Sequence, residues 1–179
     1  MFSIQHSLEN EHVRLNPLTV NDFDALYKLA SDKKVWEQHP NKDRWQRAVF
    51  KTFFDGAMQS KGAFKIMDKR TGRVAGSTRF YDYNEQDNSI HIGYTFFGTS
   101  YWGTGLNAAV KRLMLDYVFQ FVDRVHFQVG ATNYRSQIAV NRLGAIKTGE
   151  QEVAYIGEQP KLNFLYELKK EDWHSRTSI

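Results

Sequence analysis

The sequence predicts an α/β fold built on a mixed, mostly antiparallel sheet with helices on both faces, and two patterns lead to this prediction. In the middle of the chain, alternating apolar and polar residues form three segments joined by short turns, which favours an antiparallel meander: 63–69, 74–83 and 89–98. Helical and strand patterns then alternate, as helix 104–121, strand 124–131, helix 134–143, strand 145–153 and strand 162–168. A meander followed by strand–helix–strand units gives a mixed sheet covered by helices.

The first sixty residues add one strand and two helices to this plan. Residues 12–18 are typical of a strand that ends near Pro17, and residues 20–31 carry apolar side chains at helical spacing. Residues 42–60 show the same helical spacing, and Gly62 follows them. With 179 residues, 41% of them hydrophobic, the chain can bury one core, so we expect one domain over 1–179.

The sequence contains no cysteine. This excludes disulfides, a thiolate metal site and an acyl-cysteine intermediate, so any group transfer is expected to be direct. The six histidines show no metal-ligand spacing such as H-E-x-x-H, and we expect no metal.

The charge pattern argues against a nucleic-acid partner. The net charge is +4 and the pI is about 9.2, but Lys and Arg alternate with acids, as in "KKEDW". A nucleic-acid interface needs basic residues clustered on one face.

The start of the chain has no leader pattern, and no apolar run approaches the roughly 18 residues of a membrane span. We therefore expect a cytoplasmic protein without a membrane partner.

The stretch "TSYWGTGLNAAVKRLML" (99–115) places Gly103 and Gly105 directly before an amphipathic helix. Spacings of three and four predict that the helix packs against the sheet through one apolar stripe: Leu106, Val110, Leu113, Tyr117 and Phe121. Glycines there let a ligand approach the main chain, and the unpaired N–H groups of a first helical turn favour an anion, usually phosphate. Residue 108 is alanine, so the stretch is not a G-x-G-x-x-G fingerprint, and it is not a P-loop either. Glycine can also occur in such a turn for steric reasons alone.

Three blocks together resemble the GNAT superfamily of N-acetyltransferases, in the branch similar to the RimJ/RimL ribosomal-protein N-terminal acetyltransferases. They are "HIGYTFFGTSYWGTGLNAAVK" (91–111), "RVHFQVGATNYRSQIAVNRLGA" (124–145) and "FLYEL" (164–168). The resemblance implies two splayed central strands that hold acetyl-coenzyme A, with the pyrophosphate on a loop written Q/R-x-x-G-x-G/A. Here that loop is "SYWGTG", in which both glycines match and Ser100 replaces the Gln or Arg.

The resemblance also implies which residues contact the co-substrate acetyl-coenzyme A. A backbone N–H near Thr95 to Phe97, freed by a strand bulge, would hold the oxyanion of the tetrahedral intermediate. The full set of expected coenzyme contacts is Thr95, Phe96, Phe97, Trp102, Gly103, Thr104, Gly105, Leu106, Asn107, Asn133 and Ser136.

Acetyl transfer needs an acid for the departing thiolate, and Ser136 is the candidate. Asn133 and Ser136 match the N-x-x-S pattern of the family. A thiol has a pKa of about 8.5, so a hydroxyl donor at the sulfur eases its departure. Asn133 is equally a good N-cap, and Ser136 could be only a surface residue.

The attacking amine needs a base, because a primary alkyl amine is mostly protonated at pH 7. Relatives in this branch often read E-I-G-[YW], where this chain reads "HIGY", so His91 takes the glutamate position. Histidine titrates near pH 6.5 and can replace it, although a structural histidine is the alternative. Glu85 and Tyr94 are weaker candidates. Strand alternation predicts that His91 shares a face with Gly93, Thr95 and Phe97.

The acceptor is the least determined part of the prediction. Trp36, Arg79 and Tyr94 are the substrate-contact candidates, with residues 34–45 as an acceptor-side loop. A protein amino terminus, an amino acid or small amine, and an amine-bearing antibiotic all fit. Two alternatives from other classes are a non-catalytic acyl-coenzyme A-binding module and a basic nucleic-acid-binding domain. We expect a monomer or homodimer.

Overall fold

The computed structural model describes residues 3–154 and 159–177, and its centre is one eight-stranded sheet. The strand order is β1-β2-β3-β4-β5-β6-β8-β7. Among the described strands only the pair β5–β6 is parallel, so the predicted mixed, mostly antiparallel sheet is confirmed. The strands are β1 (Leu8–Glu9), β2 (Val13–Pro17), β3 (Ala63–Asp68), β4 (Arg73–Asn84), β5 (Ser89–Phe97), β6 (Arg124–Gly130), β7 (Ile146–Val153) and β8 (Lys161–Lys169).

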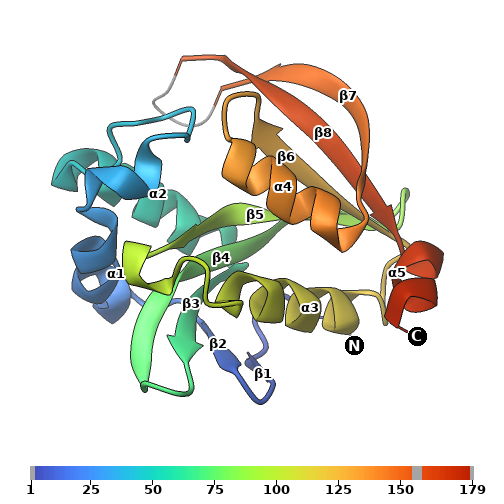
Figure 1. Ribbon diagram of the computed structural model, residues 1–179, viewed down its shortest axis with the longest axis horizontal. Coiled ribbons are helices and arrows are strands. Elements are labelled where there is room, and N and C mark those ends of the chain that lie inside the picture. The colour runs from blue at the N-terminus through green and yellow to red at the C-terminus, as the bar shows by residue number, and fades with distance from the viewer. Residues whose placement is uncertain (1–2, 155–158, 178–179) are drawn as a thin grey trace.

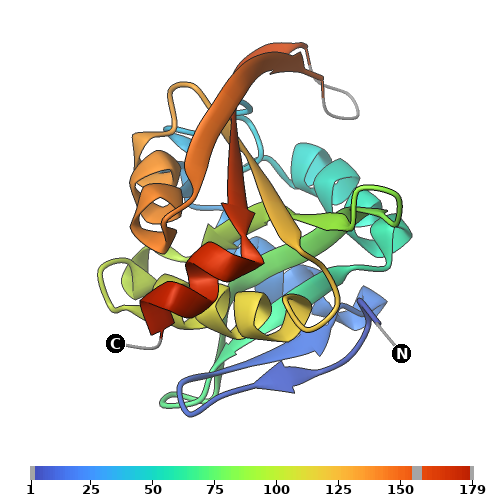
Figure 2. The same ribbon diagram turned by 90° about the vertical axis from the view of Figure 1, so that its right-hand side faces the viewer.

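Helices cover both faces of the sheet (Figures 1 and 2). The α-helices are α1 (Phe23–Ala30), α2 (Arg47–Ser60), α3 (Leu106–Val118), α4 (Tyr134–Leu143) and α5 (Lys170–Thr177). Helices α1 and α2 form one hydrophobic cluster with Phe96, whereas α3, α4 and α5 form the other with Phe97. Because Phe96 and Phe97 are neighbours on β5, the two clusters lie on opposite faces. The β7–β8 hairpin curves away from the rest of the sheet (Figure 2).

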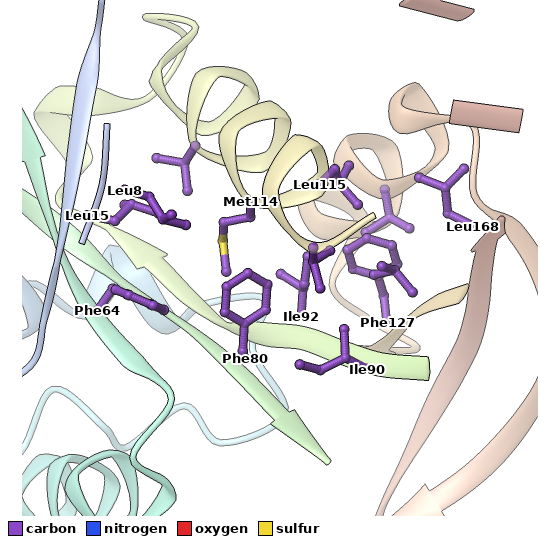
Figure 3. Close-up of a cluster of buried hydrophobic side chains, with 14 of the residues drawn as sticks. Leu8, Leu15, Phe64, Phe80, Ile90, Ile92, Met114, Leu115, Phe127 and Leu168 are labelled. Atoms are coloured by element: carbon purple, nitrogen blue, oxygen red, sulfur yellow. The ribbon is translucent and has the colours of Figure 1, made fainter. Parts of the chain in front are cut away.

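Helix α3 packs flat on one face of the sheet. Figure 3 shows Met114 and Leu115 of α3 among Phe80, Ile90 and Ile92 of β4 and β5. The predicted apolar stripe of this helix was partly wrong. Leu106 and Val110 are buried as predicted, but the other buried side chains of α3 are those of Lys111, Met114, Leu115 and Val118. Residues 113 and 117 of the predicted stripe only border the core, and the helix ends at Val118 rather than at residue 121.

The N-terminal helices are shorter than predicted. Helix α2 begins at Arg47 instead of residue 42 because the preceding backbone N–H groups bond to side chains. The N–H of Asn41 donates to Nδ1 of His39 (3.0 Å), and the N–H of Asp43 donates to Oδ1 of Asn41 (3.0 Å). Such local bonds compete with helix formation. Residues 20–22 form a short 3-10 turn (η1, Val20–Asp22) before α1, and two further turns are η2 (Lys33–Trp36) and η3 (Thr99–Tyr101).

Strand β1 and helix α5 were not predicted. Strand β1 has only two residues, and α5 is rich in charged side chains, so neither produces a clear periodic pattern. In the part of the chain that the structure describes, no helix is long and apolar enough to cross a membrane.

Candidate active site

The two central strands separate directly after His91. Strands β5 and β6 pair through Ser89–Arg124, Ile90–Val125 and His91–His126, and the pairing stops there although both strands continue. Figure 1 shows them running apart from that point. Between residues 92 and 97, the edge of β5 that faces β6 therefore has no strand partner among the described residues, and β6 pairs on its other side with β8. An extended ligand that carries amide groups can bond to such an edge.

A β-bulge interrupts β5 within this open stretch. Ser77 pairs with Phe96 and Arg79 pairs with Gly93, so Thr78 alone stands opposite Tyr94 and Thr95. Tyr94 has a φ of 52°, in the left-handed region that is uncommon for residues other than glycine. The structure thus has a bulge next to the residues 95–97 at which one was expected.

The bulge overturns one prediction about strand faces. His91 and Gly93 lie on the face covered by α2, because His91 contacts Tyr81 and an added Cβ at Gly93 would meet the same ring. Thr95 and Phe97 lie on the α3 face, where Thr95 bonds to Lys111. The extra residue at the bulge shifts the alternation by one, so His91 and Gly93 do not share a face with Thr95 and Phe97.

The glycine loop at the end of β5 presents free backbone donors. Gly103 and Gly105 have φ values of 72° and 83°, and an added Cβ would find nothing within 4 Å at either position. Across residues 3–154 and 159–177, the N–H groups of Gly103, Thr104, Gly105 and Asn107 donate no hydrogen bond, while that of Leu106 has only a long one, 3.4 Å to the Thr104 hydroxyl. The left-handed φ values explain the glycines, and the free donors at the start of α3 suit an anion.

The start of helix α4 carries the N-x-x-S pair. Oδ1 of Asn133 accepts the N–H of Ser136 (3.2 Å), so Asn133 is the N-cap. The Ser136 hydroxyl is half-buried and has no hydrogen-bond partner within the described ranges. Capping by Asn133 does not exclude a ligand contact, and the hydroxyl of Ser136 is available as a donor.

An arginine that the sequence argument missed connects this helix to the glycine loop. The guanidinium of Arg135 lies 4.1 Å from the ring centroid of Trp102, and its Nη2 donates to the carbonyl of Lys34 (3.3 Å). The indole N–H of Trp102 donates to the carbonyl of Phe97 (3.2 Å). Arg135 therefore links α4, the glycine loop and residues 34–45, and only its position inside the N-x-x-S pattern could have suggested this.

His91 lies at the point where the strands separate. Its ring centroid is 5.0 Å from that of Tyr81 and 5.2 Å from that of His126, and its Nδ1 is buried without a partner among the residues described. Burial lowers the pKa of His91 below its usual value, and the charge of His126 lowers it further, while Asp82 opposes both. His91 is therefore mostly neutral at pH 7, which is the form that can accept a proton.

Acidic side chains surround the hollow beside His91. Asp82, Glu85 and Asp87 line it together with His91 and His126. Asp87 is held by Arg124, with 2.6 Å between Oδ1 and Nη1, and its Oδ2 lies 3.5 Å from Nε2 of His126. Glu85 is exposed, in the turn before β5. The described residues contain no group of three or more His, Cys, Asp or Glu that could hold a metal ion.

The three substrate-contact candidates lie in or next to the cluster formed by α1 and α2. Arg79 is 6% exposed, and its guanidinium stacks on the ring of Tyr94 at 4.0 Å. Burial lowers the pKa of Arg79 to about 10, assisted by the charge of Arg44. Trp36 is 2% exposed, and its indole N–H already donates to the carbonyl of Ala30 (2.8 Å). The structure thus brings Arg79 and Tyr94 together at the bulge, and Trp36 packs in the core behind them.

Comparison with known proteins agrees with this geometry. Residues 12–146 match the acetyltransferase (GNAT) domain family. A GCN5-related N-acetyltransferase from Brucella melitensis has 20% identity and a TM-score of 0.84, covering 97% of this chain and 83% of that one. A GNAT-family acetyltransferase from Bacillus anthracis has 17% identity and a TM-score of 0.74, covering 93% and 99%.

The branch expected from the sequence is also represented among the similar structures. RimJ of Mycobacterium smegmatis, solved in complex with CoA-disulfide, has 17% identity and a TM-score of 0.75, covering 97% of this chain and 94% of that one. The predicted resemblance to the GNAT superfamily is confirmed, and this chain shares the fold of RimJ. The family match extends over most of the length of this chain, so the chain belongs to the GNAT acetyltransferases.

Proposed function

We propose that this GNAT acetyltransferase transfers the acetyl group of acetyl-coenzyme A directly to a primary amine in a ternary complex. The observation that carries the proposal is the open edge of β5, which starts directly after His91 and leads toward the glycine loop. Few ligands have both an extended, amide-bearing arm and a pyrophosphate. Coenzyme A has both.

The residues present fit the coenzyme at both ends of this path. The backbone N–H groups of Gly103, Thr104, Gly105 and Asn107, with open space in front of the glycines, can bind the pyrophosphate. The unpaired edge of β5 can bond to the pantetheine amides, and the start of α4 lies on the other side of the separation, next to β6. The ring of Trp102, stacked under Arg135, can border the same site. The coenzyme supplies an activated thioester when it is bound.

Three groups of this chain would carry the chemistry. Neutral His91 takes the proton of the attacking ammonium, directly or through water. A backbone N–H at the bulge of Thr95 donates to the oxygen of the thioester carbonyl as negative charge develops on it. The Ser136 hydroxyl donates to the departing thiolate. The nitrogen–carbon bond forms and the carbon–sulfur bond breaks, so no covalent enzyme intermediate is required.

The acid-lined hollow beside His91 supports a positively charged amine as the acceptor. Asp82 and Glu85 face solvent there, and they can attract an ammonium group toward His91. Protein amino termini, amino acids or small amines, and amine-bearing antibiotics all carry such a group. Arg79 and Tyr94 would contact the acceptor from the α2 side of the bulge.

The proposal is tested first by thermal unfolding with saturating acetyl-coenzyme A, coenzyme A, NAD or ATP. A ligand that binds the folded state raises the midpoint, by an amount that grows with its concentration over Kd. We expect a rise with the two coenzyme A species alone, followed by thiol release in the presence of an amine from the three classes. Absence of a rise would contradict the coenzyme site. Binding without thiol release from any amine would favour the non-catalytic acyl-coenzyme A-binding module.

A further inference from the structure

A lysine is buried beneath the β5 bulge. Lys111 lies on the face of α3 that packs against the sheet, and it is 7% exposed. Its Nζ donates to Oγ1 of Thr95 (2.6 Å), the second of the two bulge residues. Nowhere in the described ranges does Lys111 form an ion pair with a carboxylate. A long cationic side chain is thus directed into the core, toward the backbone irregularity at which the chemistry is proposed.

The bond from Lys111 continues into a short chain of hydroxyl groups. Oγ1 of Thr95 lies 2.8 Å from Oγ1 of Thr78, the fully buried residue of β4 opposite the bulge. Thr78 can in turn donate to the sulfur of Met114 (3.5 Å), and Thr95 can donate to the carbonyl of Gly93 (3.4 Å). In either arrangement, each of the two bulge-facing hydroxyls has its proton used. The side chain of Thr95 is therefore fixed from α3, from β4 and from its own strand.

Burial of Lys111 is unfavourable for stability alone. A buried amine without a carboxylate costs free energy, and an apolar side chain of the same shape would avoid that cost. Burial also lowers the pKa of Lys111 to about 7. Among the residues that the structure describes, the one contact of Lys111 that methionine could not provide is the hydrogen bond to Thr95.

We propose that Lys111 is a positioning residue that holds Thr95, and through it the β5 bulge, in the geometry that directs backbone N–H groups at the thioester carbonyl. The inference rests on the proposed acetyl transfer. Helix α3 would then have two roles: its first residues border the loop proposed to bind the pyrophosphate, and its Lys111 positions the bulge. Lys111 does not touch the reacting atoms and acts through the hydroxyl of Thr95.

Two variants separate positioning from stability, because they should move the unfolding midpoint in opposite directions. Lys111→Met removes the buried amine and should raise the midpoint at pH 7 by about 4 °C. Thr95→Val removes the hydroxyl, leaves the amine of Lys111 without its partner and should lower the midpoint. If Lys111 acts through Thr95, both variants lower kcat by about tenfold and change the KM for acetyl-coenzyme A by less than about twofold. The double variant loses no more than either single one.

A second readout does not require activity. Amide hydrogen exchange of residues 95–97 in the coenzyme-free protein should become about tenfold faster in both variants, because the bulge is less restrained. Lys65→Met is the matched control: it removes a half-buried lysine that is paired with Asp22, two strands away from β5. It should lower the midpoint and leave both kcat and the exchange at residues 95–97 unchanged.

The inference is overturned if Lys111→Met keeps wild-type kcat and wild-type exchange at the bulge. It is also overturned if kcat falls only in proportion to a lowered midpoint, which is what a purely structural lysine would give. Failure of the proposed function is distinguishable, because the wild type would then show neither a midpoint shift with acetyl-coenzyme A nor thiol release. The exchange measurement still decides whether Lys111 restrains the bulge.

Discussion

Replacing Lys111 with methionine is expected to remove part of the pH dependence of stability. Burial lowers the pKa of Lys111 from 10.5 to about 7. Its amine donates to Thr95, and the hydrogen-bond chain that continues from there to Thr78 and Met114 contains no charged side chain. Between these two pKa values, the unfolded chain binds a proton that the folded protein does not. The free energy of unfolding therefore rises with pH in this window, by up to about 1.4 kcal/mol per pH unit.

The contribution of Lys111 to the pH dependence can be measured by comparing the unfolding midpoints of wild type and Lys111→Met. From pH 7 to pH 9 the wild type should gain about 2 kcal/mol from Lys111, since the folded pKa lies at the lower end of the range. For a chain of this length, that corresponds to roughly 4–8 °C in the unfolding midpoint. Calorimetry of wild type and Lys111→Met at pH 7, 8 and 9 gives the gap between their midpoints, in which other titrating groups largely cancel. The variant should have the higher midpoint at pH 7, and the difference between the two midpoints should close or reverse by pH 9. A gap that stays constant from pH 7 to pH 9 would refute the reasoning.

Three further predictions concern the candidate site. Gly105→Val should weaken coenzyme A binding at least tenfold in isothermal titration, because φ is 83° there and the new side chain enters the open space before α3. Gly103→Ala should weaken it less. Unchanged binding in both variants would contradict the assignment of this loop to the pyrophosphate. Ser136→Ala should lower kcat about 100-fold with coenzyme affinity retained, and equal rates would remove its role as the acid. In the pH profile of kcat/KM, the acid limb should have its midpoint below pH 6.5 and should disappear in His91→Ala. In His126→Gln the midpoint should move to higher pH, because His126 helps to lower the pKa of His91. An acid limb that is the same in both variants would mean that His91 is a structural residue.

The regular part of the fold could be predicted because its periodicity is clear. The segments 63–69, 74–83 and 89–98 became β3, β4 and β5, since alternation and short turns specify antiparallel neighbours. The start of α2 was predicted five residues too early, because the periodicity of residues 42–46 does not reveal that the Asn41 side chain accepts the backbone N–H of Asp43. Periodicity predicts which side of a helix or strand is apolar, but it does not reveal where side chains compete with the helix for backbone N–H groups.

The site was less predictable, for a reason visible at one residue. Tyr94 adopts a left-handed conformation, and the single extra position that it creates moves Thr95 to the opposite face from His91. No residue type in "GYTFF" requires a bulge. The family resemblance implied one near Thr95 to Phe97, but the prediction of strand faces used strict alternation and did not include the shift that a bulge causes. Lys111 was missed in the same way, because a lysine in an amphipathic helix is expected on the solvated face and only packing shows where its amine lies.

The three residue pairs that join β5 to β6 have a mechanical consequence for the whole molecule. The sheet consists of one unit, β1 to β5, and a second unit, β6, β8 and β7, each paired internally along most of its strands. Few backbone hydrogen bonds cross this seam, so the two units are held together mainly by the hydrophobic cluster that they share with α3. We expect the second unit to open at a lower free energy than global unfolding. A ligand seated along the seam touches both units, so each opening must also break its contacts. Coenzyme binding would then decide whether the protein unfolds as one cooperative unit or as two.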